Sequence, residues 1–151
     1  MRSMLMALAA LLVMVAPGFA NDDLVVKKSP HSVGMTLDKL TAVLESKGIT
    51  VFARIDHAAG AVKVDQQLRP TQVLVFGNPK LGTPLMSADQ RIGLDLPLKA
   101  LAWQDASGAV WLGYTKPDAL KARYAIEGRD EVFAKITGAL DKLTGAALKT
   151  E

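Results

Sequence analysis

The chain has 151 residues, half of them hydrophobic, and a formal net charge of +3, which suits a globular domain with one sizeable core. It contains no cysteine, so disulfides, thiolate catalysis and cysteine-based zinc or iron–sulfur sites are excluded. The basic residues are scattered rather than clustered with aromatics, so we expect no nucleic-acid partner.

The first twenty residues have the pattern of a secretory signal peptide. Arg2 precedes an apolar run over residues 4–16, and small residues allow cleavage between Ala20 and Asn21. The run is shorter than the ~20 residues that a membrane-spanning helix needs. We therefore predict export to the periplasm and a single domain over residues 21–151, with no membrane segment after cleavage.

A strand and a helix are predicted to follow this leader. Residues 24–29 are rich in β-branched side chains, which indicates a strand. Three leucines between residues 37 and 44 recur at helical spacing, so a helix is predicted with Thr36 as its N-cap. Gly48 supplies the left-handed position that ends such a helix.

A second strand is predicted over residues 49–55, and we expect it to lie beside the first. Regular alternation places Val51, Ala53 and Ile55 on one of its faces. Alanine and glycine at residues 58–61 then predict a connection that includes a short helical turn.

The next strand and helix are predicted around residue 80. Residues 73–76 are apolar on both faces, which is typical of a central strand covered on more than one side. Thr83 and Pro84 resemble the N-cap and first position of a helix. A short helix is therefore predicted over residues 84–90.

The clearest hairpin joins strands at residues 98–103 and 109–114 through a four-residue turn at 105–108. Pro117 opens a short helix, and Asp130 begins the last one. The predicted order is strand, helix, four strands, helix, with small helical insertions. Such hairpin connections favour a mostly antiparallel sheet with its helices on one face, an α+β two-layer sandwich.

Three short motifs resemble the signature of one bacterial family. They are residues 69–86 (RPTQVLVFGNPKLGTPLM), 55–57 (IDH) and 94–98 (LDLPL). Over about residues 33–143 the chain resembles the family named domain of unknown function 302. The resemblance implies a β-α-β(4)-α arrangement similar to the TATA-binding-protein half-fold, without any implication of DNA binding. It implies no activity, because the family name states none.

Asp56 and His57 are the first candidates for chemistry, because a histidine beside a carboxylate can act as a general base. The competing interpretation is a histidine that hydrogen-bonds across the loop after its strand. No nucleophile motif accompanies the pair. We therefore predict no catalytic residue.

The loop over residues 77–83 has some features of an anion site. It combines glycines with Lys80 and, at Asn78 to Thr83, a predicted helix N-terminus whose free N–H groups favour negative charge. It is not a Walker loop, because Thr83 replaces the lysine that should follow the second glycine. The alternatives are a purely structural turn and a small anionic ligand.

Arg69 and Asp95 stand at the ends of apolar strands, and we expect them to pair across the end of the sheet. Trp103, Trp111 and Tyr114 lie on the hairpin. They could stack on a flat ligand, but burial in the core is the preferred interpretation.

No metal or cofactor is predicted, because zinc needs at least three ligands and the mature chain offers only two histidines. The first hypothesis is therefore a periplasmic binding or interaction module without catalytic activity. It self-associates as a homodimer through a sheet edge or face, and its small ligand contacts the residues already discussed: Asp56, His57, Arg69, Asn78, Lys80, Thr83 and Asp95. The alternative is an enzyme that uses Asp56 and His57 as acid and base while residues 78–83 bind an anionic group.

Overall fold

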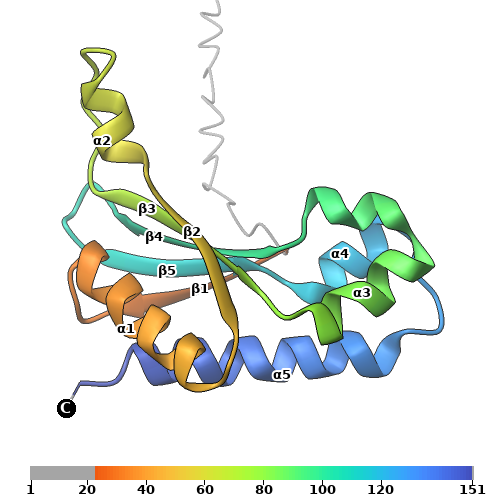
Figure 1. Cartoon of the computed structure of the whole chain (residues 1–151). Coiled ribbons are helices and arrows are strands. Elements are labelled where there is room, and N and C mark those ends of the chain that lie inside the picture. Colours follow the sequence, from red (N-terminus) through yellow and green to blue (C-terminus); the bar gives the residue numbers. More distant parts are fainter. Residues whose placement is uncertain (1–22, 151) are drawn as a thin grey trace, which may run out of the picture.

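The computed structural model describes residues 23–150. Within them, five strands form one antiparallel sheet in the order β1-β5-β4-β3-β2 (Figure 1). Their bounds are β1 Leu24–Ser29, β2 Thr50–Asp56, β3 Thr71–Gly77, β4 Leu98–Gln104 and β5 Val110–Thr115. The predicted α+β class and antiparallel sheet are confirmed.

Two long helices cover one face of this sheet, α1 (Val33–Ser46) and α5 (Asp130–Ala147) (Figure 1). The shorter helices lie at the ends of the strands: α2 (His57–Val62), α3 (Pro79–Ala88), the 3-10 turn η1 (Gln90–Leu94) and α4 (Pro117–Arg123). The helical turn expected after the second strand and the helices expected at Pro117 and Asp130 are present. The molecule therefore has two layers, one of strands and one of helices.

The prediction that the first two strands are neighbours is wrong. β1 pairs with β5, from Leu24 opposite Thr115 to Ser29 opposite Val110, whereas β2 pairs with β3 at the other edge. Helix α1 explains the separation, because it carries the chain beneath the sheet from one edge to the other (Figure 1). The connection is therefore a crossover.

The prediction of regular alternation along β2 is also wrong, because a β-bulge interrupts the strand. The pairing with β3 shifts between Val51 and Ala53, so that Phe52 is an extra residue without a partner. Val51 lies opposite the buried Phe76 on the helix side, whereas Ala53 lies opposite Val75 on the other side. A bulge bends its strand and re-aims side chains, which here splits the three residues expected on one face.

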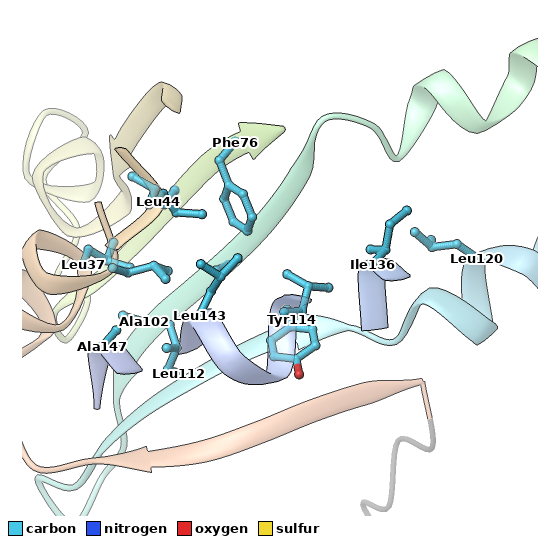
Figure 2. Close-up of a cluster of buried hydrophobic side chains, with 14 of the residues drawn as sticks. Leu37, Leu44, Phe76, Ala102, Leu112, Tyr114, Leu120, Ile136, Leu143 and Ala147 are labelled. Atoms are coloured by element: carbon cyan, nitrogen blue, oxygen red, sulfur yellow. The ribbon is translucent and has the colours of Figure 1, made fainter. Parts of the chain in front are cut away.

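The core fills the space between the sheet and the two long helices (Figure 2). The helices contribute Leu37, Leu44 and Ile136, among others, and the strands contribute Phe76 and Leu112. Tyr114 belongs to the same cluster and is buried. Its predicted burial in the core is therefore confirmed. The side of the strands that carries these residues is therefore the inner face.

Helix α1 begins earlier than predicted. Its N-cap is Ser32, whose hydroxyl accepts a hydrogen bond from the Met35 backbone N–H at 3.2 Å. Thr36 is instead fully buried within the helix, donates to the Ser32 carbonyl at 2.8 Å and lies 2.6 Å from the Ser29 hydroxyl. A serine four residues upstream satisfies the free N–H groups of the first turn, so Thr36 is available to link the helix to β1.

Candidate functional site

Asn78, rather than Thr83, caps the helix that follows β3. Its side-chain oxygen accepts from the Lys80 backbone N–H at 2.9 Å, and Pro79 takes the first helical position. The helix therefore has the predicted combination of an N-cap and a proline at its first position, but five residues earlier in the chain than predicted. Pro84 lies inside α3, where its ring nitrogen cannot donate to the carbonyl four residues before it.

A cavity of about 220 Å³ lies beneath α3, and we call it the α3 cavity. Its roof is the loop and helix over residues 77–86, and its floor is the middle of α5. The start of β2 and the segment before β4 close its sides. The lining residues are Ile49, Phe52, Phe76, Gly77, Asn78, Pro79, Leu81, Gly82, Thr83, Met86, Leu96, Pro97, Leu98, Ile136, Ala139, Leu140 and Leu143.

None of these lining residues carries a charge, and only Asn78 and Thr83 have polar side chains. Lys80, the cation of the proposed anion loop, is exposed and does not line the cavity. An apolar wall without a cation gives a buried negative charge nothing to offset its desolvation. The cavity therefore suits an uncharged molecule.

Asp56 has a structural role at the far end of β2. One carboxylate oxygen accepts from the Ala59 backbone N–H at 2.9 Å and so caps α2, and the other accepts from the Gln72 side chain at 2.9 Å. His57 is exposed as the first residue of α2. Among the residues that the structure describes, no hydrogen bond joins Asp56 to the imidazole of His57, so the carboxylate does not orient it as a general base requires.

Asp56 and His57 also lie far from the α3 cavity. Thr50 pairs with Gly77 beside the cavity, whereas Asp56 pairs with Gln72 at the other end of the same ladder. The six intervening steps correspond to about 20 Å of extended chain. The structure therefore brings Asn78 and Thr83 together but not with His57.

The expected pair of Arg69 and Asp95 does not form. Arg69 donates to the Gln104 backbone carbonyl at 3.1 Å. Asp95 accepts from Arg123 at 2.8 Å and from the Tyr124 hydroxyl at 2.6 Å. The prediction failed because Asp95 follows η1 at the end where α4 packs, whereas Arg69 precedes β3 at the opposite end of the sheet.

The surroundings of Asp95 favour its ionised form. Partial burial acts to raise its pKa, but the hydrogen bonds from Tyr124 and Arg123 outweigh burial, so that the pKa lies below its usual value. The same contact raises the pKa of Tyr124. This partly exposed cluster therefore joins η1 to α4.

Trp103 and Trp111 do not follow Tyr114 into the core. Both are partly buried on the face of the sheet opposite the helices, where they pair across β4 and β5. The indole N–H of Trp111 donates to Asp105 in the hairpin turn at 2.7 Å. The preferred interpretation, burial in the core, is therefore correct for the tyrosine and wrong for the two tryptophans.

We call this second side of the sheet the open face, because α1 and α5 both lie on the inner face (Figure 1). One apolar row crosses all five strands through directly paired residues: Val26, Gly113, Leu101, Val73 and Ile55. The flanking positions are Leu24, Lys28, Ala53, Thr71, Val75, Lys99, Trp103, Trp111 and Thr115. Only Lys28 and Lys99 among them are charged.

The open face is the feature that sequence reasoning missed. Residues 73–76 are apolar on both faces, which predicted a central strand with other elements covering both of its faces. Strand β3 is indeed internal in the sheet. Helices cover only its inner side. The apolar residues on both faces of this strand were therefore the sequence signal for the open face. They marked an apolar surface without helices rather than a second layer of helices.

Comparison with known protein families shows to which family the chain belongs. A family model described as domain of unknown function DUF302 matches residues 25–143. The chain belongs to this family. A crystal structure of an uncharacterized conserved DUF302 protein from Bacillus stearothermophilus has a TM-score of 0.70 at 20% identity, covering 83% of this chain and 94% of that one. The DUF302 fold is thus shared at low sequence identity.

Relatives at higher identity have a different name. Proteins of Brucella suis and Brucella abortus, each named fluoride-specific ion channel FluC 1, are 44% identical over 117 residues, which is 76% of this chain. The match covers 46% and 43% of their lengths, so this chain spans less than half of the relatives. Within residues 23–150, no helix is long and apolar enough to cross a bilayer.

Proposed function

We propose that this DUF302 chain is an exported, non-catalytic interaction module that pairs with a second copy of itself through the open face. The observation that carries the proposal is the uninterrupted apolar row from Val26 to Ile55 on the side of the sheet without helices. Val26 and Ile55 are 45% and 48% exposed. A contiguous apolar patch of this kind is typical of an interaction site.

The dimensions of the open face suit a pair of small domains. Five strands about 4.8 Å apart and about 20 Å long cover on the order of 500 Å² in projection. Side chains enlarge the accessible area, which brings it toward the ~800 Å² per partner of an ordinary interface. A patch of this size lies toward the upper end of the ~300–600 Å² that the largest apolar patch of a monomer covers, and such patches are often functional.

A second copy fits the composition of the face. Self-pairing about a twofold axis requires one patch that is complementary to itself, and an apolar row meets this condition without charge pairing. The two lysines of the face, Lys28 and Lys99, lie in the rows that flank the central one. Solvated charges at the rim and apolar side chains at the centre are the usual anatomy of a protein interface.

The proposed export rests on the leader over residues 1–20, which lies outside the described residues. Signal-peptide cleavage after Ala20 predicts a mature N-terminus at Asn21. Intact mass and N-terminal sequencing of the protein from its own host check this. A retained leader in a membrane-bound protein would contradict cleavage without affecting the pairing proposal.

The pairing proposal extends to the Brucella relatives, less than half of whose length matches this chain. An ion channel needs membrane-spanning segments, whereas residues 23–150 of this chain include no suitable helix. We infer that the matching part of those relatives lies outside the bilayer and that the remainder forms the channel. A domain that pairs with itself would hold two such proteins together.

The enzyme hypothesis has less support. It requires Asp56, His57 and the loop around Asn78 to share one pocket, and they lie at opposite ends of β2 and β3. Asp56 is already committed to capping α2.

The pairing proposal is tested with charge substitutions on and off the open face. Val26→Lys and Leu101→Lys each place a cation in the central row, and Leu94→Lys places one at an 82% exposed leucine of η1. We expect the first two variants to be monomers and the third to dimerise like the unmodified chain, as measured by light scattering after gel filtration. Circular dichroism shows whether each variant is folded. We expect Val26→Lys to be tolerated best, because Val26 lies on the edge strand β1 and is 45% exposed. Dimers in both folded open-face variants would contradict the proposal.

A further inference from the structure

The α3 cavity is a second apolar feature of the molecule, and pairing through the open face does not account for it. It lies at the end of the sheet beneath α3, with Met86 above it and Ala139 and Leu140 of α5 below. Its apolar side chains come from four separate parts of the chain. Such convergence of apolar walls with a few polar groups is typical of a small-molecule site.

The structure holds the roof of this cavity in place from both ends. Asn78 caps the first turn of α3 through the Lys80 N–H at 2.9 Å. Farther along the helix, the Arg129 side chain donates to the Pro84 carbonyl at 3.3 Å, which ties α3 to the start of α5. The hollow is therefore bounded by fixed backbone rather than by a loose loop.

Small residues contribute to the space. A β-carbon at Gly82 would lie 3.8 Å from Leu96 Cδ1 and 3.9 Å from Met86 Cε. These are ordinary contact distances, so an alanine is compatible with the site and projects toward its wall. Ala139 occupies the opposite side. An apolar hollow left empty forgoes dispersion contacts, so filling it with a ligand or a larger side chain stabilises the fold.

Two polar groups remain available at this apolar site. Asn78 uses its side-chain oxygen for the cap, which leaves its amide nitrogen to donate. The Thr83 hydroxyl makes no side-chain hydrogen bond among the residues that the structure describes. A ligand with a single oxygen can therefore be held by hydrogen bonds while the rest of it contacts carbon.

We propose that the α3 cavity binds a small neutral amphiphile, an apolar body with one hydrogen-bonding oxygen, such as a medium-chain alcohol. The volume of about 220 Å³ exceeds the ~150 Å³ cavity that accommodates benzene and is below the ~300 Å³ at which drug-sized sites begin. The absence of charge from the lining excludes a carboxylate as the preferred ligand. This inference is independent of pairing, because the cavity and the central row share no residue.

The methionines of the described chain allow a direct test. Met86 lines the cavity, whereas Met35 is 48% exposed on α1 and serves as an internal control. We would label methionine methyl groups with ¹³C in the purified chain and titrate it with 1-hexanol or with hexanoate, which differ in charge at the head group. The proposal predicts a saturable shift of the Met86 methyl signal with hexanol, no shift of Met35, and binding of hexanoate at least about tenfold weaker. No saturable shift of Met86, or equal binding of the two probes, would overturn it.

Cavity-filling substitutions provide the matched control. Ala139→Leu places three more carbons in the cavity, and Ala146→Leu makes the same change at an exposed position of the same helix. We expect Ala139→Leu to raise the melting temperature and to abolish the hexanol shift, and Ala146→Leu to leave the shift unchanged. If Ala139→Leu does not fold, Gly82→Ala tests the same point from the roof with a single methyl group. Unchanged hexanol binding in the folded cavity-filling variant would contradict the proposed location.

Discussion

The indole ring of Trp103 lies across Gly113 on the neighbouring strand, so close that a β-carbon at residue 113 would be 3.0 Å from its Cζ3 atom. The glycine gives the central row of the open face a position without a side chain, and the tryptophan ring covers it. Aromatic side chains stabilise strand glycines in this way by shielding the exposed backbone. The centre of the open face is therefore apolar throughout, although one of the five positions in its central row is a glycine.

Gly113→Ala is expected to destabilise the fold by about 1 kcal/mol, because the methyl group must displace the ring. In a Trp103→Ala background the same substitution is expected to be neutral or stabilising, because alanine favours the strand over glycine. Urea unfolding of the four proteins of this double-mutant cycle measures the coupling. Equal effects in both backgrounds would show that the ring does not rest on the glycine.

Asp95 is expected to be coupled to Arg123 and not to Arg69. Asp95→Asn and Arg123→Ala should each lower the free energy of unfolding modestly, because the ion pair is partly exposed although its hydrogen bonds are charge-assisted. Their double mutant should lose less than the sum, whereas the effects of Asp95→Asn and Arg69→Ala should add. Chemical denaturation at neutral pH checks both cycles. A coupling of Asp95 to Arg69 as large as that to Arg123 would contradict the observed geometry.

Asp105 is expected to make stability depend on acid pH. Hydrogen bonds from the Ser107 and Trp111 side chains lower its pKa to about 2. Because the folded pKa is depressed, its contribution is present above the unfolded value near 3.9 and is lost as the pH falls toward about 2. The Trp111 indole N–H resonance should shift with this titration, and Asp105→Asn should remove that shift. A Trp111 signal that moves around pH 4 instead would contradict the depressed pKa.

Asp56→Ala is expected to loosen α2, because the helix loses its N-cap at a cost of about 1 kcal/mol. His57→Ala should have little effect, because the imidazole is exposed. Hydrogen exchange of the Ala59 amide measures the difference and should be about fivefold faster only in the first variant. Comparable acceleration in both variants would mean that the two residues act as one unit.

Much of the fold could be predicted because its signals are local. The turn at residues 105–108 fixed the β4–β5 hairpin, and the leucines of α1 and the apolar face of α5 gave those helices. Capping was predicted less accurately, because several residues compete for it. Thr36 and Thr83 were acceptable N-caps, but Ser32 and Asn78 upstream satisfied the same N–H groups.

The parts that could not be predicted depend on distant pairing. Nothing near Leu24 indicates that β1 pairs with Thr115 and its neighbours. Asp95 and Tyr124 lie 29 residues apart and meet only because α4 packs beside η1. The α3 cavity likewise combines Ile49, Leu96 and Ile136, and no short motif connects them.

Sedimentation equilibrium of the purified mature chain over a wide concentration range tests the central claim most directly. Pairing through the open face predicts a mass that rises with concentration toward twice that of the monomer. The Leu94→Lys variant should follow the same curve, and the folded Val26→Lys variant should stay at the monomer mass. A monomer mass for the unmodified chain at every concentration would contradict the claim that the open face joins two copies.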